Sequence, residues 1–276
     1  MVKEKNTMSD AVISLRGINK NYGKQQVLHD VDMDINRGDI YGLIGRNGAG
    51  KTTLFKVILG LTDYSGGTLT IEGKSNELSS GRQKIGFLIG TNFFSYMNAR
   101  ENLEYYKNLK GIKDKGEIDR VLAIVGLDKV KSTFRSYSMG MKQRLGIANA
   151  ILGGPEILIL DEPSNGLDPQ GIADVRELIQ HLNSEFGMTV IVSSHILGEL
   201  QNTAHRFGII NEGTLARAIT REDLQTSQKT IRLQVDDLDH ARTLLNDAGI
   251  KILNEVTETK SLEDFYFELV KGEKHA

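Results

Sequence analysis

Gly45-Arg46-Asn47-Gly48-Ala49-Gly50-Lys51-Thr52-Thr53 is the stretch that decides the fold, and it follows the pattern G-x-x-x-x-G-K-[ST]. Its glycines let the backbone turn closely around a group of negatively charged oxygens without a Cβ atom in the way. Lys51 supplies a mobile positive charge to such a group, and the Thr52 hydroxyl suits the Mg²⁺ that accompanies it. The stretch therefore predicts a loop that binds the phosphates of a nucleotide.

The residues on either side supply the setting that such a loop requires. Residues 39–44 form a short apolar run typical of a buried strand, and the largely apolar residues 54–59 predict a helix that Gly60 ends. The positive end of that helix points at the bound phosphates. The alternative is a glycine-rich turn with a surface lysine, which does not need a strand before it and a helix after it.

Length and composition limit the class of protein. The chain has 276 residues, enough for one large and one small domain, with 39% hydrophobic and 25% charged residues as in soluble proteins. A net charge of -2 argues against sequence-independent binding of nucleic acid, and the lack of cysteine excludes disulfides and thiolate chemistry. Residues 1–10 are polar and no apolar run reaches the length of a membrane span, so we expect a cytosolic chain.

A second acidic motif follows an apolar run. Residues 157–160 read Ile-Leu-Ile-Leu and are followed by Asp161 and Glu162. We expect this strand to lie beside the strand that feeds the phosphate loop, with its carboxyl end at the ligand. Asp161 would then hold Mg²⁺ through its water shell, and Glu162 would act as general base on a water aligned with the γ-phosphate. Two solvated carboxylates after a buried strand are the alternative.

Three further residues stand at the ends of predicted elements. Asp168 is a good N-cap and Pro169 a good first residue for the next helix, which explains both without any function. His195 follows the buried strand predicted at residues 189–193. A lone histidine is usually structural or solvated, but one at this edge of the sheet is a candidate contact for the γ-phosphate.

The remaining chain surrounds this core with a strand region and a helical region. Residues 11–18 alternate between apolar and polar residues, which predicts an edge strand. Tyr22 lies in the turn before the next alternating segment, and it is either a surface residue or an aromatic ring that stacks on a purine. Loop 90–97 carries three aromatic residues, which either await a partner or pack beneath the loop. Helices at 99–110, 117–125 and 141–152 predict an inserted helical lobe at about 90–155.

The pattern changes from about residue 228. A strand at 230–235, a helix at 239–248, a strand at 250–253 and a helix at 262–270 predict a small α+β appendage over residues 228–276. The predicted fold class is therefore an α/β P-loop NTPase over residues 1–227. It has a mixed sheet core, an antiparallel β edge, the helical lobe and this C-terminal appendage.

With these motifs placed, residues 13–224 resemble the ATP-binding subunit of an ABC transporter. The five matching motifs are the Walker A stretch Gly45 to Thr53, the signature Tyr-Ser-Met-Gly-Met at 137–141, the Walker B stretch Ile157 to Glu162, the D-loop Ser164 to Asp168, and the switch histidine His195. Within the family the chain looks most like the bacitracin-resistance and lantibiotic-immunity group, which shares the form Tyr-Ser-x-Gly-Met-Lys-Gln-Arg and a short C-terminal appendage.

The resemblance implies a mechanism that needs two copies of the domain. Each of two ATP molecules, with Mg²⁺ held by Thr52 and Asp161, is sandwiched between the Walker A face of one subunit and the signature loop of a second, identical one. Glu162 then activates water, and Lys51 and His195 stabilise the transferring phosphoryl group. The residues that the resemblance places on ATP are Tyr22, Gly45, Arg46, Asn47, Gly48, Ala49, Gly50, Lys51, Thr52, Thr53, Ser138, Gly140 and Asp168.

Three positions depart from the family pattern. Met139 and Met141 replace the first glycine and the glutamine of the signature. Ser138 and Gly140 are kept, so we expect their phosphate contacts to be kept too, and the two replacements put only the contacts to ribose in question. Gly90 stands where the family has a glutamine, or this group a glutamate, that touches Mg²⁺ or the attacking water. We therefore predict slow or weakly coupled basal hydrolysis.

The resemblance implies an ATPase at the cytoplasmic face of the cell membrane, driving a separately encoded permease and exporting a peptide antibiotic or a similar compound. Loop 90–97 sits where the family docks its permease. A soluble ABC ATPase acting on ribosomes or DNA is the alternative, but such proteins have two fused modules or long coiled coils. A P-loop kinase is a third possibility, which would lack the signature and D-loop motifs.

Overall fold

The computed structural model describes residues 11–75, 78–90, 92–221, 223 and 235–250. The chain divides into two compact units, Met1–Leu224 and Gln225–Ala276, and each is described by itself. In the second unit the described residues hold helix α9 (Leu238–Asp247), which begins at the N-cap Asp237. Apart from Val235 and Ile250, the strands predicted at 230–235 and 250–253 and the helix at 262–270 lie outside the described residues, so the α+β appendage stays a prediction.

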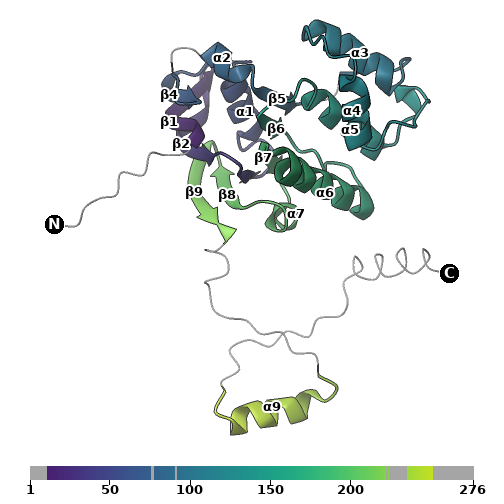
Figure 1. The fold of residues 1–276 in the computed structure, drawn as a ribbon. Helices are drawn as coiled ribbons and strands as arrows, with labels where there is room; N and C mark the ends of the chain where they lie inside the picture. The colour runs from purple at the N-terminus through teal and green to yellow at the C-terminus, as the bar shows by residue number, and fades with distance from the viewer. Residues whose placement is uncertain (1–10, 76–77, 91, 222, 224–234, 251–276) are drawn as a thin grey trace. The chain divides into compact units, whose positions relative to one another are not determined.

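The smaller of two sheets in the first unit is antiparallel, with the order β2-β1-β4 (Figure 1). Its strands are β1 (Ala11–Tyr22), β2 (Gln25–Asn36) and β4 (Gly66–Ile71). The prediction of an edge strand at residues 11–18 is wrong, because Ile13 in β1 pairs with a residue of β2 on one side and of β4 on the other. Alternation shows that one face is covered and does not show how many strands are neighbours.

The larger sheet is mixed and has the order β5-β6-β7-β3-β8-β9. Its strands are β3 (Ile40–Ile44), β5 (Ile85–Leu88), β6 (Ile157–Leu160), β7 (Thr189–Ser194), β8 (Arg206–Asn211) and β9 (Thr214–Thr220). Five of them run parallel, and β9 pairs antiparallel with β8 at the edge. This confirms the predicted mixed sheet with an antiparallel edge.

The expectation that β6 lies beside β3 is wrong, because β7 lies between them and pairs with both. Helix α6 (Pro169–Phe186) links β6 to β7 and returns the chain to the neighbouring place in the sheet. Ile44 is opposite Ser194, and Leu160 is opposite Val192, so the three strands end at a common edge. Residues just beyond these ends can therefore meet, although β6 and β3 are roughly 10 Å apart.

Both faces of the central strands β6, β7 and β3 of the larger sheet are buried, as is usual for parallel strands. In β6, Leu158 and Leu160 belong to one hydrophobic cluster, and Ile157 and Ile159 belong to the other. The second cluster also holds residues of helix α1 (Lys51–Leu59) and of the antiparallel sheet, whereas α6 contributes to the first. The sheet thus packs between two hydrophobic clusters, which hold in place the carboxyl ends of the strands that carry the site residues.

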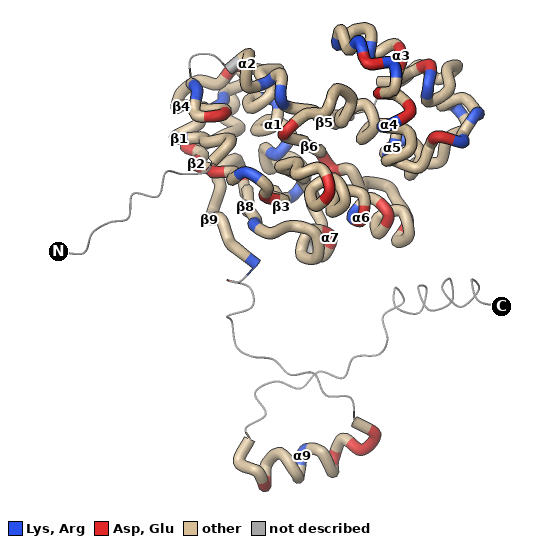
Figure 2. The backbone as a smooth tube through the Cα atoms, viewed as in Figure 1, with Lys and Arg blue, Asp and Glu red and all other residues tan. Residues whose placement is uncertain are grey.

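Between β5 and β6 the chain forms the helical lobe seen at the upper right of Figure 1. Its elements are α3 (Ala99–Leu109), α4 (Glu117–Ile124), the 3-10 helix η1 (Phe134–Ser136) and α5 (Met139–Ala150). Acidic and basic residues are interspersed along α3 and α4, whereas the charged residues of α5 are basic (Figure 2). Among the elements whose residues are all described, α2 (Leu78–Arg82) and α7 (Leu197–Gln201) are short helices outside the lobe. Within the described residues, no helix has the length and apolar composition that a bilayer crossing requires.

The aromatic residues of loop 90–97 divide between the two roles considered for them. Phe93 packs against the core, with its ring centroid 5.6 Å from Tyr106 and 5.3 Å from Phe134. Tyr96 is 70% exposed and contacts only the half-buried ring of Phe94 among the described aromatic pairs. The loop therefore uses one ring as an anchor and presents another to solvent.

Candidate active site

The phosphate loop joins β3 to α1, and its ends are held more tightly than its middle. A Cβ atom at Gly45 would lie 2.5 Å from the Ile210 carbonyl oxygen, so only glycine fits against β8. Gly50 caps α1 with φ +109°, a conformation that side chains avoid. The middle residues Arg46, Asn47 and Gly48 are exposed, whereas Ala49, Gly50 and Lys51 are buried. The loop thus presents an open backbone on a fixed base.

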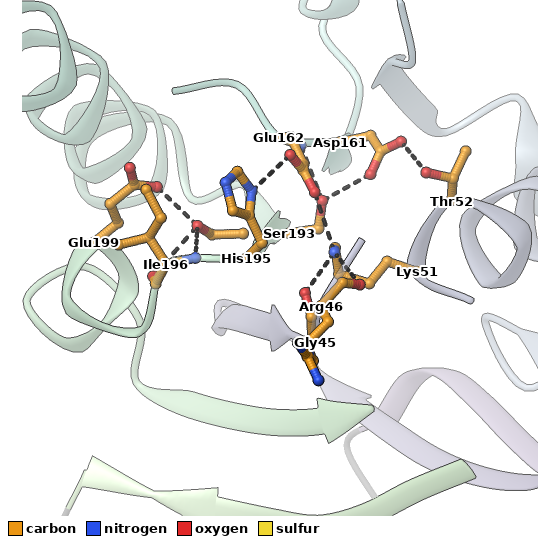
Figure 3. A network of polar contacts seen from close by, with 11 residues as sticks. Gly45, Arg46, Lys51, Thr52, Asp161, Glu162, Ser193, His195, Ile196 and Glu199 are labelled. Atoms are coloured by element: carbon orange, nitrogen blue, oxygen red, sulfur yellow. Dashed lines mark hydrogen bonds and ion pairs between the residues drawn. The ribbon is translucent and has the colours of Figure 1, made fainter. Parts of the chain in front are cut away.

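Lys51 is 4% exposed and stays inside the loop. Its Nζ donates to the carbonyl oxygens of Gly45 at 2.6 Å and Arg46 at 3.1 Å. It also lies 3.1 Å from Oε1 of Glu162, which ends the neighbouring motif (Figure 3). The two motifs predicted from sequence therefore meet through a direct ion pair.

Asp161 is held by two hydroxyl groups from different elements (Figure 3). Thr52, in the first turn of α1, donates to Oδ2 at 2.6 Å, and Ser193, in β7, donates to Oδ1 at 2.7 Å. A carboxylate beside a hydroxyl suits Mg²⁺, which takes few protein ligands when phosphates share it. Among the described residues no cluster of three or more His, Asp or Glu side chains is placed to hold a metal ion.

Glu162 joins Lys51 to His195. Its backbone has φ +50°, and its N–H donates to the Ser193 hydroxyl at 2.9 Å. One carboxylate oxygen faces Lys51, and the other lies 2.9 Å from Nδ1 of His195. Because an ionised carboxylate only accepts, Nδ1 donates in this contact and Nε2 is left for another group. The geometry fixes both oxygens of Glu162 in place.

A small cavity of about 80 Å³ adjoins Glu162 and His195. Its walls come from the ends of β6 and β7, the D-loop and the start of α6 and α7. The lining residues are Glu162, Ser164, Asn165, Gly166, Leu167, Ile172, Ser194, His195, Ile196 and Glu199. Ser194 donates to Glu199 at 2.7 Å and accepts the Ile196 N–H at 2.9 Å, which closes the backbone around His195.

The signature residues begin α5, in the helical lobe. Ser138 is exposed, and as N-cap its hydroxyl accepts the Met141 N–H at 3.2 Å. Met139 is 49% exposed, and a Cβ atom at Gly140 would meet only the Ser138 hydroxyl, at 4.0 Å. Tyr137 anchors this tip on α3, because its hydroxyl accepts the Ala99 N–H at 3.1 Å, and burial raises its pKa. No contact joins Ser138 or Gly140 to the phosphate loop in the described part of the chain.

The three other predicted positions lie outside the network of Lys51, Asp161 and Glu162. Asp168 is exposed and caps α6 by accepting the Gly171 N–H at 2.8 Å, the local role expected for it. Tyr22 is 47% exposed, and Lys20 Nζ lies 4.7 Å from the centre of its ring. Gly90 is exposed with φ +67° and has no atom within 4 Å of an added Cβ.

Sequence reasoning missed Ser193, which belongs to the network, and Glu199, which lies beside it. Ser193 is fully buried and contacts Asp161 and Glu162, the two residues that follow β6. Glu199, in α7, accepts a hydrogen bond from Ser194. The signal was the pair Ser193-Ser194 that ends an apolar strand and precedes His195. Two hydroxyls in a buried strand need partners, and the sheet order decides which partners they meet.

The loop after β3 and the Asp-Glu pair after β6 define a P-loop NTPase. The ABC transporter family model matches residues 28–165, half of the chain. The protein belongs to the ABC transporter family, as an ATP-binding subunit with ATPase activity. The resemblance stated from the sequence is thereby confirmed.

Two relatives and one solved structure illustrate the similarity. The chain is 36% identical over 299 residues to the bacitracin transport ATP-binding protein BcrA of Bacillus licheniformis, covering 95% of this chain and 98% of that one. It is 40% identical over 206 residues to the lantibiotic transport ATP-binding protein SrtF of Streptococcus pyogenes, covering 74% and 89%. It is also similar to MJ0796, a bacterial ABC transporter cassette determined as a dimer, with a TM-score of 0.68 and 26% identity over 76% of this chain and 98% of that one.

Proposed function

We propose that this ATPase powers a separately encoded membrane permease that exports a peptide antibiotic or a similar compound, and that it works at the cytoplasmic face of the cell membrane. Relatives named for bacitracin transport and lantibiotic transport support the substrate class. The observation that carries the proposal is the meeting of Lys51, Asp161, Glu162 and His195 at one edge of the larger sheet.

The residues at this edge fit ATP with Mg²⁺. When bound, Mg²⁺ would neutralise charge on the phosphates, and Thr52 and Asp161, already 2.6 Å apart, are the groups to hold it. Lys51 lies on the loop whose backbone N–H groups would surround the phosphates, and its ammonium can move from the loop carbonyls to a phosphate oxygen. Tyr22 is 47% exposed, and adenine would stack on its ring.

Glu162 is the proposed general base. Its two oxygens are oriented by Lys51 and His195, so it would take a proton from a water held between it and the γ-phosphate. Lys51 and His195 would then stabilise charge on the transferring group. Gly90 offers no side chain to the metal or the water, and slow or weakly coupled basal turnover is therefore part of the proposal.

The second half of each site would come from another copy of this chain. Ser138 and Gly140 stand at the N-terminus of α5 with exposed or open surroundings, where N–H groups favour an anion. Pairing the phosphate loop of one copy with this tip of its partner, beside the D-loop with Asp168, would enclose two ATP molecules. The exposed Tyr96, together with Phe94, is the proposed contact for the permease.

Pull-down from native membranes tests the proposal. The Glu162→Gln variant should bind ATP without hydrolysing it, and should be recovered as a closed dimer with an integral membrane protein. The wild-type chain in ADP is the control and should be recovered mainly as a monomer. Recovery with ribosomes instead of a membrane protein, or failure of the variant to dimerise with ATP, would contradict it.

A further inference from the structure

We infer that Ser193 is a positioning residue whose single hydroxyl orients both the metal-binding carboxylate of Asp161 and the base Glu162. The inference rests on the roles proposed above for these two residues. Ser193 lies in β7, one strand away from the β6 motif, and no motif of the sequence includes it.

The hydroxyl of Ser193 uses its donor and its acceptor on two different residues. It donates to Asp161 Oδ1 at 2.7 Å and accepts the Glu162 N–H at 2.9 Å. Ser193 is 0% exposed, so water does not compete for either contact. A buried hydroxyl with both contacts made has one orientation, and it transmits that orientation to its partners.

Each contact has a distinct consequence at the site. With Oδ1 held by Ser193, the Asp161 carboxylate turns Oδ2 towards the Thr52 hydroxyl, 2.6 Å away, and these are the two groups proposed to hold Mg²⁺. The contact to the Glu162 N–H fixes a backbone with φ +50°, which is unfavourable for a residue with a side chain. That conformation directs the carboxylate towards Lys51 and His195.

Ser194 is a matched control within the same strand. It is 4% exposed, and successive side chains of a strand point to opposite faces. Its hydroxyl binds Glu199 and the Ile196 N–H, and it touches neither Asp161 nor Glu162 among the described contacts. Removing this hydroxyl deletes the same atom from the same strand but leaves both carboxylates held.

The test measures ATPase activity of the full-length protein as a function of Mg²⁺ concentration. For Ser193→Ala we expect half-maximal activity at about tenfold higher Mg²⁺, because a hydrogen bond to a charged group is lost, and lower turnover at saturating Mg²⁺. ADP affinity in EDTA should stay within twofold of wild type. Ser194→Ala should leave the Mg²⁺ requirement within twofold.

A further variant keeps the inference testable if Ser193→Ala folds poorly. Ser193→Cys fills the same volume with a weak donor and should raise the Mg²⁺ requirement in the same direction. An unchanged requirement in both Ser193 variants, or an equal rise in Ser194→Ala, would overturn the inference.

The roles of the carboxylates are tested separately. If Glu162→Gln or Asp161→Asn hydrolyses ATP at the wild-type rate, the proposed chemistry fails whatever Ser193 does. If both are inactive while the Ser193 variants keep wild-type turnover and Mg²⁺ requirement, only the inference about Ser193 fails.

Discussion

The phosphate loop and the signature tip at residues 137–141 serve one proposed reaction but are built in opposite ways. Lys51 is 4% exposed and Ser193 is 0% exposed, and Glu162 links them by an ion pair to Lys51 and a hydrogen bond to Ser193 (Figure 3). Ser138 is exposed and Met139 is 49% exposed, with no contact to that network in the described chain. A single chain thus completes the half that is proposed to bind phosphate and metal, whereas the half that is proposed to act on a partner copy is exposed.

The largest effect on turnover should follow from replacing Glu162, the proposed general base in the phosphate-loop half of the site. Glu162→Gln cannot accept a proton, so turnover should fall about 10²- to 10⁴-fold, while ATP binding through the phosphate loop remains. Glu156→Gln is the control, because Glu156 precedes the other end of β6, where its partners are Arg37 and Lys84. Phosphate release and nucleotide binding measure the two effects, and turnover above a tenth of wild type would contradict the assignment.

A mixing experiment tests whether the outward half works across a dimer. Ser138→Ala should lower turnover about 10²-fold, because one donor to the transition state is lost, without weakening nucleotide binding to the monomer. Lys51→Ala should also lower turnover, because it removes the positive charge of the phosphate loop and leaves the signature tip intact.

Mixing the two inactive variants is the sharper test. A head-to-tail dimer of one Lys51→Ala chain and one Ser138→Ala chain contains one site with neither defect, so activity should reappear. If activity does not reappear although the two chains are shown to associate, the proposal that each site is formed by two copies is contradicted.

Tyr22, on whose ring adenine is proposed to stack, should contribute to ATP binding and not to the rate of hydrolysis. Tyr22→Ala should weaken ATP binding about tenfold, since stacking of a base on an aromatic ring contributes about 1–3 kcal/mol. Tyr22→Phe keeps the ring, over which Lys20 lies at 4.7 Å, and should bind normally. Competition by inorganic triphosphate should be equal in all three proteins, and unequal competition would place Tyr22 at the phosphates instead.

A carboxylate added at position 90 should raise the basal rate of ATP hydrolysis. Its φ of +67° makes a side chain cost about 1–2 kcal/mol, but no neighbouring atom obstructs it. Gly90→Glu should therefore fold and raise basal turnover severalfold, with Gly90→Ala as the control for the backbone cost. Basal turnover that does not respond to the glutamate would show that no ligand is missing at this position.

The smallest effect concerns the ion pair that joins the signature helix to α6. Arg144 in α5 pairs with Asp174, and both side chains are about one-third exposed. Such pairs contribute about 0.2–1 kcal/mol, so Arg144→Met should lower the thermal midpoint by about 1–4 °C. Arg100→Met removes the more exposed pair with Asp119 and should shift it less. Equal shifts would show that the ion pair between α5 and α6 stabilises the fold no more than the exposed pair of Arg100 and Asp119 does.

Sequence reasoning worked best where neighbours in the chain are also neighbours in space. The N-cap Asp168 and the C-cap Gly60 act as predicted, because capping involves residues within one turn. The edge prediction for β1 and the placing of β6 beside β3 both failed. Each depended on a strand that arrives far along the chain, β4 in one case and β7 in the other.

The sequence by itself determined the strand–loop–helix that binds phosphate, the carboxylates after β6 and the histidine after β7. Each of these follows from short spacing, backbone freedom at glycine and burial of an apolar run. Only the tertiary structure decided that β7 lies between β6 and β3, so that Ser193 meets Asp161 and Glu162 while Lys51 meets Glu162. The physical reason is that strand pairing joins segments far apart in sequence, and their order depends on how the whole chain packs its two cores.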